Sequence, residues 1–355
     1  MATKDVYYVK RTPFKRLGRF VLKFFSIILA LLLVVIIALC SIMWVLAKGP
    51  SPTAQRLFVM TVKETSAMGW LANMYLSEAE INNILKPAEP VEEYHETDTS
   101  LISLPVPKPT QPVADQSPEE EPVWEEAEDE EGIELHEISG NGYRGYMIVV
   151  RDPLRVFVGT PSHLGYSGMT LMDMVTRTNA VAGINAGGFY DPEGTSTGGI
   201  PDGIVICEGE LKWGAGSGYV NVIGFDADGI LHVGTMTPTA AMNLGLQWAV
   251  SFGPTLISNG VAQDKEALRS GINPRTAIGQ RSDGAVLLLV VDGRQIDTFG
   301  ATFDDLVEIF LEYGAVNAAN LDGGSSTLMM LDGEIINSCA SVSGPRRIPT
   351  AFLVR

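Results

Sequence analysis

The chain has 355 residues and a formal net charge of −17, with 46% hydrophobic residues, 37 glycines and only 8% aromatic residues. This length allows one sizeable domain with appendages or two modest domains, and the glycine content favours short strands and turns over a helical bundle. An acidic chain without a basic stripe argues against nucleic acid as a partner.

The N-terminal part has the pattern of a membrane anchor. Residues 1–23 carry seven Lys or Arg residues and one Asp, and residues 24–47 then run for 24 positions without a charge. Such a run can span a hydrocarbon core and is too long for the apolar region of a cleaved signal. Because the positive charges precede it, we expect a single-pass membrane protein, with residues 1–23 as a cytoplasmic tail and the C-terminal domain outside the cell.

Two segments connect this anchor to the rest of the chain. Residues 48–86 predict a helical stalk, since Ser51-Pro52 and the run from Ser77 to Glu80 are helix-start signals. Residues 87–132 contain fifteen Asp or Glu residues and eight prolines, which predicts a disordered, extended linker. A spacer is the favoured interpretation of the linker, and a cation- or partner-binding tail is the alternative.

Residues 133–355 have the pattern of one globular domain. Apolar runs such as 143–150 and 220–225 predict strands, several of them paired across Asp-Gly turns, whereas 170–178 and 303–313 predict helices. Two helices among at least eight interleaved strands indicate an α+β domain of mixed sheets with a few packing helices.

The three cysteines, Cys40, Cys207 and Cys339, lack the spacing of a zinc site. A disulfide between Cys207 and Cys339 and a pair of buried free thiols both remain open.

The most informative polar cluster is the run from Asn320 to Thr327. Asp322 is followed there by Gly323 and Gly324 and then by the hydroxyl residues Ser325 and Ser326. Paired glycines let backbone N–H groups point into one concavity, which suits an anion, and the hydroxyls add donors for phosphate or sugar oxygens. Asp322 could act beside them as a base, a nucleophile or a metal ligand. A tight turn capped by hydroxyls is the alternative.

A second cluster follows the predicted strand 180–185. Asn185 ends that strand and precedes Gly187, Gly188 and Phe189. The amide could bind a sugar hydroxyl and the aromatic ring could stack on a sugar face, whereas the alternative is a turn with a core aromatic. Asp202, just before the strand 203–211, is a candidate ligand or orienting carboxylate, and a plain turn residue is the alternative.

Two charged residues mark the ends of other predicted strands. Arg275 enters an apolar strand, which is unfavourable unless the guanidinium group meets an anion such as phosphate; an ion pair with an aspartate is the alternative. Asp292 ends an apolar strand before a glycine, at a site edge or in a turn. The three histidines of residues 133–355 lie outside all these clusters, so a Ser-His-Asp triad is not supported.

The order and spacing of these clusters resemble the phosphodiester glycosidase family, which includes the lysosomal uncovering enzyme and bacterial exopolysaccharide-associated proteins. The resemblance runs from Ala182 to the C-terminus and rests on residues 184–189, 202–204, 209–211, 275–279, 292–294 and 320–326. The sequence departs from the family at Ser325, where a third glycine is common, and at Gly188, where a second aromatic residue is usual.

The resemblance implies hydrolysis of sugar-1-phosphodiester linkages in phosphorylated cell-surface glycans or glycoconjugates. We expect Asp322 to be the nucleophile or base, with Asp292 second, and Arg275 and residues 323–326 to hold the phosphate. Asn185 would contact the sugar. A divalent cation such as Ca²⁺ or Mg²⁺ is permitted but not required. The rival hypothesis is a non-catalytic binding or assembly protein for an anionic exopolysaccharide or cell-wall polymer, and a peptidoglycan hydrolase is a weaker third.

Overall fold

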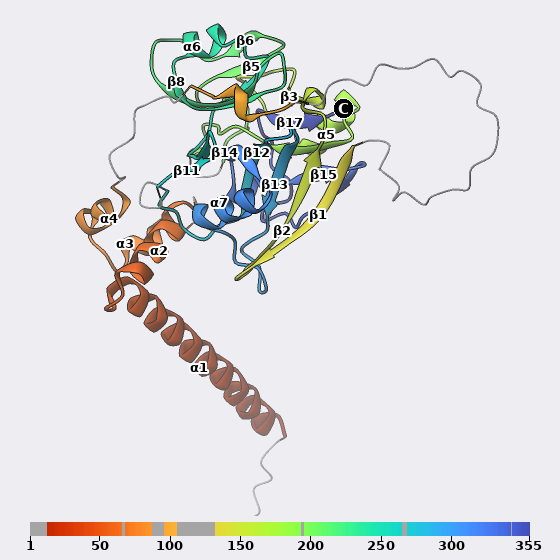
Figure 1. Ribbon diagram of the computed structural model, residues 1–355. Coiled ribbons are helices and arrows are strands. Elements are labelled where there is room, and N and C mark those ends of the chain that lie inside the picture. Colours follow the sequence, from red (N-terminus) through yellow and green to blue (C-terminus); the bar gives the residue numbers. More distant parts are fainter. Residues whose placement is uncertain are drawn as a thin grey trace, which may run out of the picture.

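The computed structural model describes residues 13–65, 68–86, 96–104, 132–192, 195–264, 268–341 and 343–355. Figure 1 shows one long helix, α1, that stands away from a body of strands, with three short helices at its end. Most of the predicted linker, residues 87–95 and 105–131, lies outside the described residues.

Seven α-helices are described: α1 (Pro13–Lys48), α2 (Pro52–Lys63), α3 (Trp70–Asn73), α4 (Glu78–Leu85), α5 (Leu171–Thr178), α6 (Pro238–Asn243) and α7 (Phe303–Glu312). Within α1, the most apolar stretch of the segment Gly18–Lys48 has a mean hydropathy of 3.2, and none of that stretch is buried in the protein. Within the described part of the chain it is the one helix that is long and apolar enough to cross a membrane.

The helices α2, α3 and α4 pack together at the end of α1. Their shared core includes Ala47, Val59, Leu71 and Ile81. The helix-start signals seen in the sequence form real caps, because the Ser51 hydroxyl accepts a hydrogen bond from the N–H of Ala54 and Ser77 forms a capping box at the start of α4.

In the described residues, seventeen strands form three sheets, and each strand pairing is antiparallel. The seven-stranded sheet has the order β1 (Ile133–Gly140), β2 (Tyr143–Val150), β13 (Val286–Val291), β12 (Arg275–Arg281), β14 (Ala315–Leu321), β10 (Thr255–Ser258) and β11 (Val261–Ala262).

One five-stranded sheet has the order β16 (Glu334–Ile335), β15 (Met329–Leu331), β4 (Ala182–Asn185), β17 (Ala351–Val354) and β3 (Val156–Gly159). The other has the order β6 (Glu210–Trp213), β5 (Val205–Cys207), β9 (Trp248–Val250), β7 (Val220–Phe225) and β8 (Leu231–Met236).

The largest core lies where the three sheets meet, and it contains side chains such as Ile184, Phe225, Leu288 and Phe352. Helix α7 packs on the seven-stranded sheet through Leu306, while α5 and α6 cover the two five-stranded sheets. The predicted α+β class with a few packing helices is therefore confirmed, and the glycine-rich composition is explained by the many turns between short antiparallel strands.

Residues 96–104 correct the predicted linker. The side chain of Ile102 is buried against Ile230 and Val316, and the N–H of Ser103 donates to the carbonyl oxygen of Ser282 at 2.7 Å. The linker prediction is wrong at these positions because composition averaged over 46 residues conceals a short apolar stretch that the domain surface can bury.

The central strands of the seven-stranded sheet bring distant residues to one edge. Arg275 begins β12 and pairs with Val291, the last residue of β13. The next residue, Thr276, pairs with Leu321, the last residue of β14. Because these strands are antiparallel, the start of β12 lies beside the ends of β13 and β14, so Arg275, Asp292 and Asp322 leave the sheet at the same edge.

Candidate active site

A cavity of about 760 Å³ opens at this edge of the seven-stranded sheet. Its lining includes several of the residues that the sequence indicated: Phe189, Arg275, Asp322, Gly323, Gly324, Ser325 and Ser326. A volume of this size can hold a small sugar with a phosphodiester. The cavity therefore joins Arg275 and the Asp-Gly-Gly turn, although their sequence positions are far apart.

Two hydrogen bonds of its main-chain groups fix the position of Asp322. Its N–H donates to the carbonyl oxygen of Ala186 at 2.9 Å, and its carbonyl oxygen accepts from Nδ2 of Asn185 at 2.5 Å. Burial raises the pKa of the Asp322 carboxyl to about 7, although a hydrogen bond from Ser326 and the charge of Arg346 act in the opposite direction. Asp322 can thus be protonated or ionised near neutral pH, which suits a group that exchanges a proton or attacks a carbon atom.

Two arginines flank the turn that follows Asp322. Gly324 has φ +61°, and a Cβ atom there would lie 3.2 Å from Nη2 of Arg294. On the other side, Nη1 of Arg346 lies 3.4 Å from Oγ of Ser325. The N–H groups of Gly324 and Ser326 are already used, since they donate to the carbonyl oxygens of Pro274 and Gly323. The guanidinium groups, more than a nest of free N–H groups, therefore supply the donors for an anion here.

Arg346 belongs to the wall of the cavity and was not among the predicted site residues. It pairs with Asp191 at 2.6 Å, and both side chains are largely buried. Its guanidinium carbon also lies 5.0 Å from the centre of the Phe189 ring. The available signal was the basic Pro345–Pro349 run before the last strand, but this run alone did not distinguish a buried arginine from a surface one.

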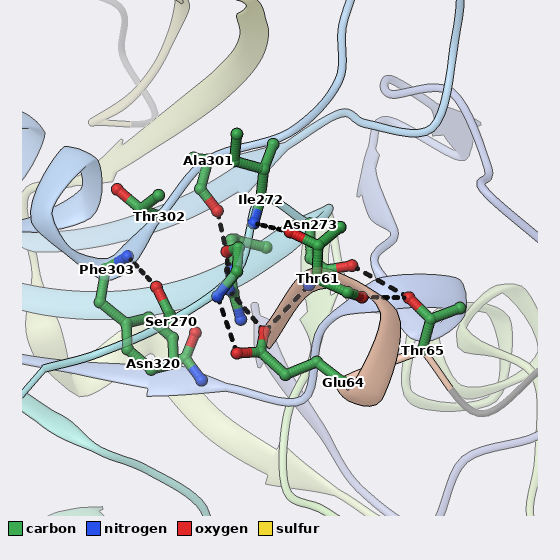
Figure 2. Close-up of polar contacts among 12 residues, drawn as sticks. Thr61, Glu64, Thr65, Ser270, Ile272, Asn273, Ala301, Thr302, Phe303 and Asn320 are labelled. Carbon is green, nitrogen blue, oxygen red and sulfur yellow. Dashed lines mark hydrogen bonds and ion pairs between the residues drawn. The ribbon is translucent and has the colours of Figure 1, made fainter. Parts of the chain in front are cut away.

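Arg275 is deeply buried, with a side chain only 7% exposed. Its Nε donates to the carbonyl oxygen of Ala301 at 3.0 Å, and its guanidinium carbon lies 4.4 Å from the centre of the Phe303 ring. Nη2 pairs with Glu64 at 2.9 Å, a residue of the predicted stalk that no sequence pattern connects with this site. Figure 2 shows the surroundings of Glu64 at the end of α2.

Asn185 and Asp292 lie behind the cavity lining. Oδ1 of Asn185 accepts from Oγ1 of Thr276 at 2.9 Å and from the N–H of Leu328 at 3.0 Å. Asp292 is 4% exposed, and its Oδ1 accepts from Nδ2 of Asn337 at 3.1 Å and from the N–H of Ser338 at 3.0 Å. Burial raises the pKa of Asp292. Both side chains tie together segments around the site, and this geometry favours positioning over the substrate contacts that we predicted.

The remaining predicted residues support the same wall. The N–H of Gly187 donates to Oγ1 of Thr350 at 2.9 Å. Gly188 is packed so closely that a Cβ atom would lie 2.6 Å from the ring of Phe252. Partial burial raises the pKa of Asp202, whose negative charge in turn contributes to the raised pKa of Asp322. These residues shape the cavity or change the electrostatic potential inside it, but they do not line it.

Two further lining residues, Phe252 and Asn320, were missed as site residues. Phe252 lies against Gly188 and lines the cavity. Asn320 is 2% exposed, and its Nδ2 donates to the carbonyl oxygen of Gly253 at 2.9 Å. Within the described chain its Oδ1 has no hydrogen-bond partner, which leaves a buried acceptor at the cavity.

In the portion of the chain that the structure describes, no group of three or more His, Cys, Asp and Glu side chains is arranged as a metal site. Cys207 and Cys339 are both free thiols, and burial raises the pKa of Cys207 to about 11.

The fold and the cavity define an α+β domain in which three acidic residues, Glu64, Asp191 and Asp322, line one cavity with three arginines. The chain belongs to the phosphodiester glycosidase family, whose model matches residues 178–355. The family resemblance noted in the sequence is thereby confirmed.

Known relatives extend over a similar part of the chain. N-acetylglucosamine-1-phosphodiester alpha-N-acetylglucosaminidase of Bos taurus is 27% identical over 213 residues, which cover 54% of this chain and 40% of that protein. The SPbeta prophage-derived uncharacterized protein YomE of Bacillus subtilis is 29% identical over 194 residues, covering 53% of this chain and 29% of that protein. The matched region thus spans less than half the length of these relatives.

A solved structure supports the fold. The catalytic domain of zebrafish N-acetylglucosamine-1-phosphodiester alpha-N-acetylglucosaminidase, described as auto-inhibited by its pro-peptide, superposes with a TM-score of 0.54 and 23% sequence identity. The match covers 63% of this chain and 82% of the zebrafish chain.

Proposed function

We propose that this chain hydrolyses sugar-1-phosphodiester linkages of cell-surface glycans or glycoconjugates in the cavity around Asp322. One observation carries the proposal: the Asp322 side chain lines the same cavity as Arg275, Arg294 and Arg346. Burial, which raises the pKa of the Asp322 carboxyl to about 7, supports it. Family membership supports the reaction class, and the bovine relative is named for an N-acetylglucosamine-1-phosphodiester substrate.

The chemistry follows from the charges. Water adds to the anomeric carbon, the bond from that carbon to the phosphate oxygen breaks, and the products are a free sugar and a phosphomonoester. Because the phosphate leaves as a stable anion, the site needs a strong general acid less than other glycosidases do. The arginines neutralise the phosphate, while the ionised form of Asp322 attacks the anomeric carbon or removes a proton from water.

Two aromatic residues of the cavity lining suit the sugar. The rings of Phe189 and Phe252 line the cavity and offer apolar surface for stacking. The buried Oδ1 of Asn320 can accept a hydrogen bond from a sugar hydroxyl or an amide N–H. In this proposal Asn185 and Asp292 hold the backbone of the site in place and do not touch the substrate.

The proposal includes a membrane anchor. The length and apolarity of α1 support a single membrane span, and the basic residues before it support a cytoplasmic N-terminus. The catalytic domain would then lie outside the cell, where phosphorylated glycans of the cell envelope are accessible.

Substitution of Asp322 tests the proposal. Purified Asp322→Asn and wild-type protein would be incubated with defined sugar-1-phosphodiesters, with and without a chelator, and the released sugar measured. Asp332→Asn is the matched control, because Asp332 lies in the exposed β15–β16 turn. We expect Asp322→Asn to lose at least a hundredfold in rate, about the contribution of an acid–base group, and full activity of this variant would contradict the proposal. Binding of an anionic glycan without any turnover by the wild-type protein would instead favour the assembly-protein hypothesis.

A further inference from the structure

The end of helix α2 is docked on the Arg275 side of the cavity. Oε1 of Glu64 accepts from the N–H of Gly271 at 2.8 Å. Its Oε2 accepts from Nδ2 of Asn273 and from Nη2 of Arg275, each at 2.9 Å. Figure 2 shows Glu64 at the end of α2, with its carboxylate directed toward Asn273.

This set of donors is what a phosphate group would use. It combines a backbone N–H, a side-chain amide and a guanidinium group, all directed at one anion. All three donors lie within residues 178–355, the part of the chain that defines the family, whereas Glu64 comes from the membrane-proximal segment. A carboxylate from outside the matched region thus occupies an anion site that belongs to the domain.

Neighbouring contacts hold the same segment in place. Oγ1 of Thr61 accepts from the N–H of Ile272 at 2.9 Å. Nη2 of Arg294 donates to Oγ1 of Thr65 at 3.0 Å, so the segment also engages the arginine beside Gly324. The backbones are close as well, because a Cβ atom at Gly271 would lie only 2.3 Å from the backbone nitrogen of Thr61.

The ion pair between Glu64 and Arg275 is replaceable, because the arginine is much more deeply buried than its carboxylate partner. The Arg275 side chain is 7% exposed, whereas that of Glu64 is 32% exposed. If Glu64 leaves, the buried guanidinium group retains, among the described residues, the carbonyl oxygens of Ala301 and Gly271, the face of Phe303 and the more distant charge of Asp305. A buried charge without a counter-ion is strongly unfavourable, so another anion that enters from the cavity takes the place of the carboxylate.

We infer that Glu64 is a built-in competitor of the substrate phosphate, and that the end of α2 must release Arg275 before a phosphodiester can bind there. This inference rests on the proposed function and adds its regulation. Because α2 shares a core with the end of α1, through Val59 and Ala47, the competitor is attached to the helix that we propose to lie in the membrane. Removal of the Glu64 charge should therefore strengthen anion binding, whereas a Glu64 that completes the active site would give the opposite result.

The first test measures anion binding and turnover by the full chain in detergent. Wild type, Glu64→Gln and a control, Glu78→Gln, would be titrated with inorganic phosphate by calorimetry. Initial rates would be measured with the methyl diester of N-acetylglucosamine 1-phosphate. Glu78 lies in the exposed first turn of α4. We expect Glu64→Gln to lower the phosphate dissociation constant and the KM by about tenfold, with the control unchanged. Equal or weaker phosphate binding by Glu64→Gln would overturn the inference.

A second variant removes the docked helix without changing the donors. Gly271→Ala retains its N–H, but the new methyl group collides with the backbone of Thr61 and should displace α2. The same gain in phosphate affinity is expected, and an affinity equal to that of wild type in both variants would contradict the inference. If both variants bind phosphate more tightly but no variant hydrolyses any diester, the proposed function fails while the competition by Glu64 stands.

Discussion

Arg346 and Asp191 form a 2.6 Å ion pair in the wall of the cavity that Asp322 lines. The two residues come from loops that are distant in sequence, and the charges of both act on the Asp322 carboxyl. Arg346 lowers the pKa of Asp322 and Asp191 raises it, so the ionisation of the proposed catalytic group depends on both partners.

The rate should depend on pH through Asp322. Because burial raises its pKa to about 7, the ionised form predominates only above that pH. If Asp322 acts as nucleophile or base, kcat/KM rises about tenfold per pH unit below pH 7 and levels off above it. A pH–rate profile with a defined sugar-1-phosphodiester measures this, and a rate that falls through pH 7 would show that the protonated form is the active one.

The same shift affects stability. The folded state binds the Asp322 proton more tightly than the unfolded state, so this carboxyl contributes stability at low pH that is lost as the pH rises through about 7. Asp322→Asn should therefore be more stable than wild type at pH 8, by on the order of a few kcal/mol, with a smaller difference at pH 5. Urea unfolding at both pH values measures the difference, and equal differences at the two would refute the assigned shift.

Neutralising Arg346 should move the pH profile. Since its charge lowers the pKa of Asp322, Arg346→Gln should shift the inflection of kcat/KM to higher pH and Arg346→Lys should restore part of the shift. Arg347→Gln is the matched control, because Arg347 is exposed and donates to the carbonyl oxygen of Gly168 at 3.2 Å. An unchanged inflection in Arg346→Gln would remove Arg346 from the electrostatics of the site.

Replacement of Asn185 separates positioning from sugar binding. Its amide makes three hydrogen bonds, to Asp322, Thr276 and Leu328. Asn185→Ala should therefore destabilise the domain by about 2–4 kcal/mol, and it should lower kcat more than it raises KM. Denaturant unfolding together with steady-state kinetics checks this. A variant of unchanged stability with a raised KM would restore the sugar contact that the sequence predicted.

Local sequence patterns predicted much of the fold and one side of the site. Strand β12 was visible as an apolar run that begins at Arg275, and Asp322 was placed just after the end of a strand. The antiparallel pairing of β12 with β14 brings those two residues to one edge. These features were predictable because each depends on a few neighbouring residues. The turn that was the alternative for the glycines after Asp322 is present as a short 3-10 helix, Gly324–Ser326, and its hydrogen bonds use part of the N–H groups that the predicted anion site would need.

Contacts between distant segments could not be predicted in this way. Glu64 meets Arg275 across 211 positions, and the pattern of the stalk indicates only a helix. Arg346 lies in a loop whose burial depends on Asp191 from another part of the chain. Residues 96–104 were included in a linker because their neighbours are acidic and proline-rich, although the domain surface buries Ile102. In each case the contact depends on a partner that is distant in sequence and is brought close only by the tertiary fold.

The most direct measurement of the central claim is the position of an oxygen label after hydrolysis in H₂¹⁸O. If the cavity directs water to the anomeric carbon, with Asp322 as nucleophile or base, the label appears on the released sugar and the phosphomonoester remains unlabelled. Label in the phosphate group would mean attack at phosphorus, and it would contradict the account given for Asp322.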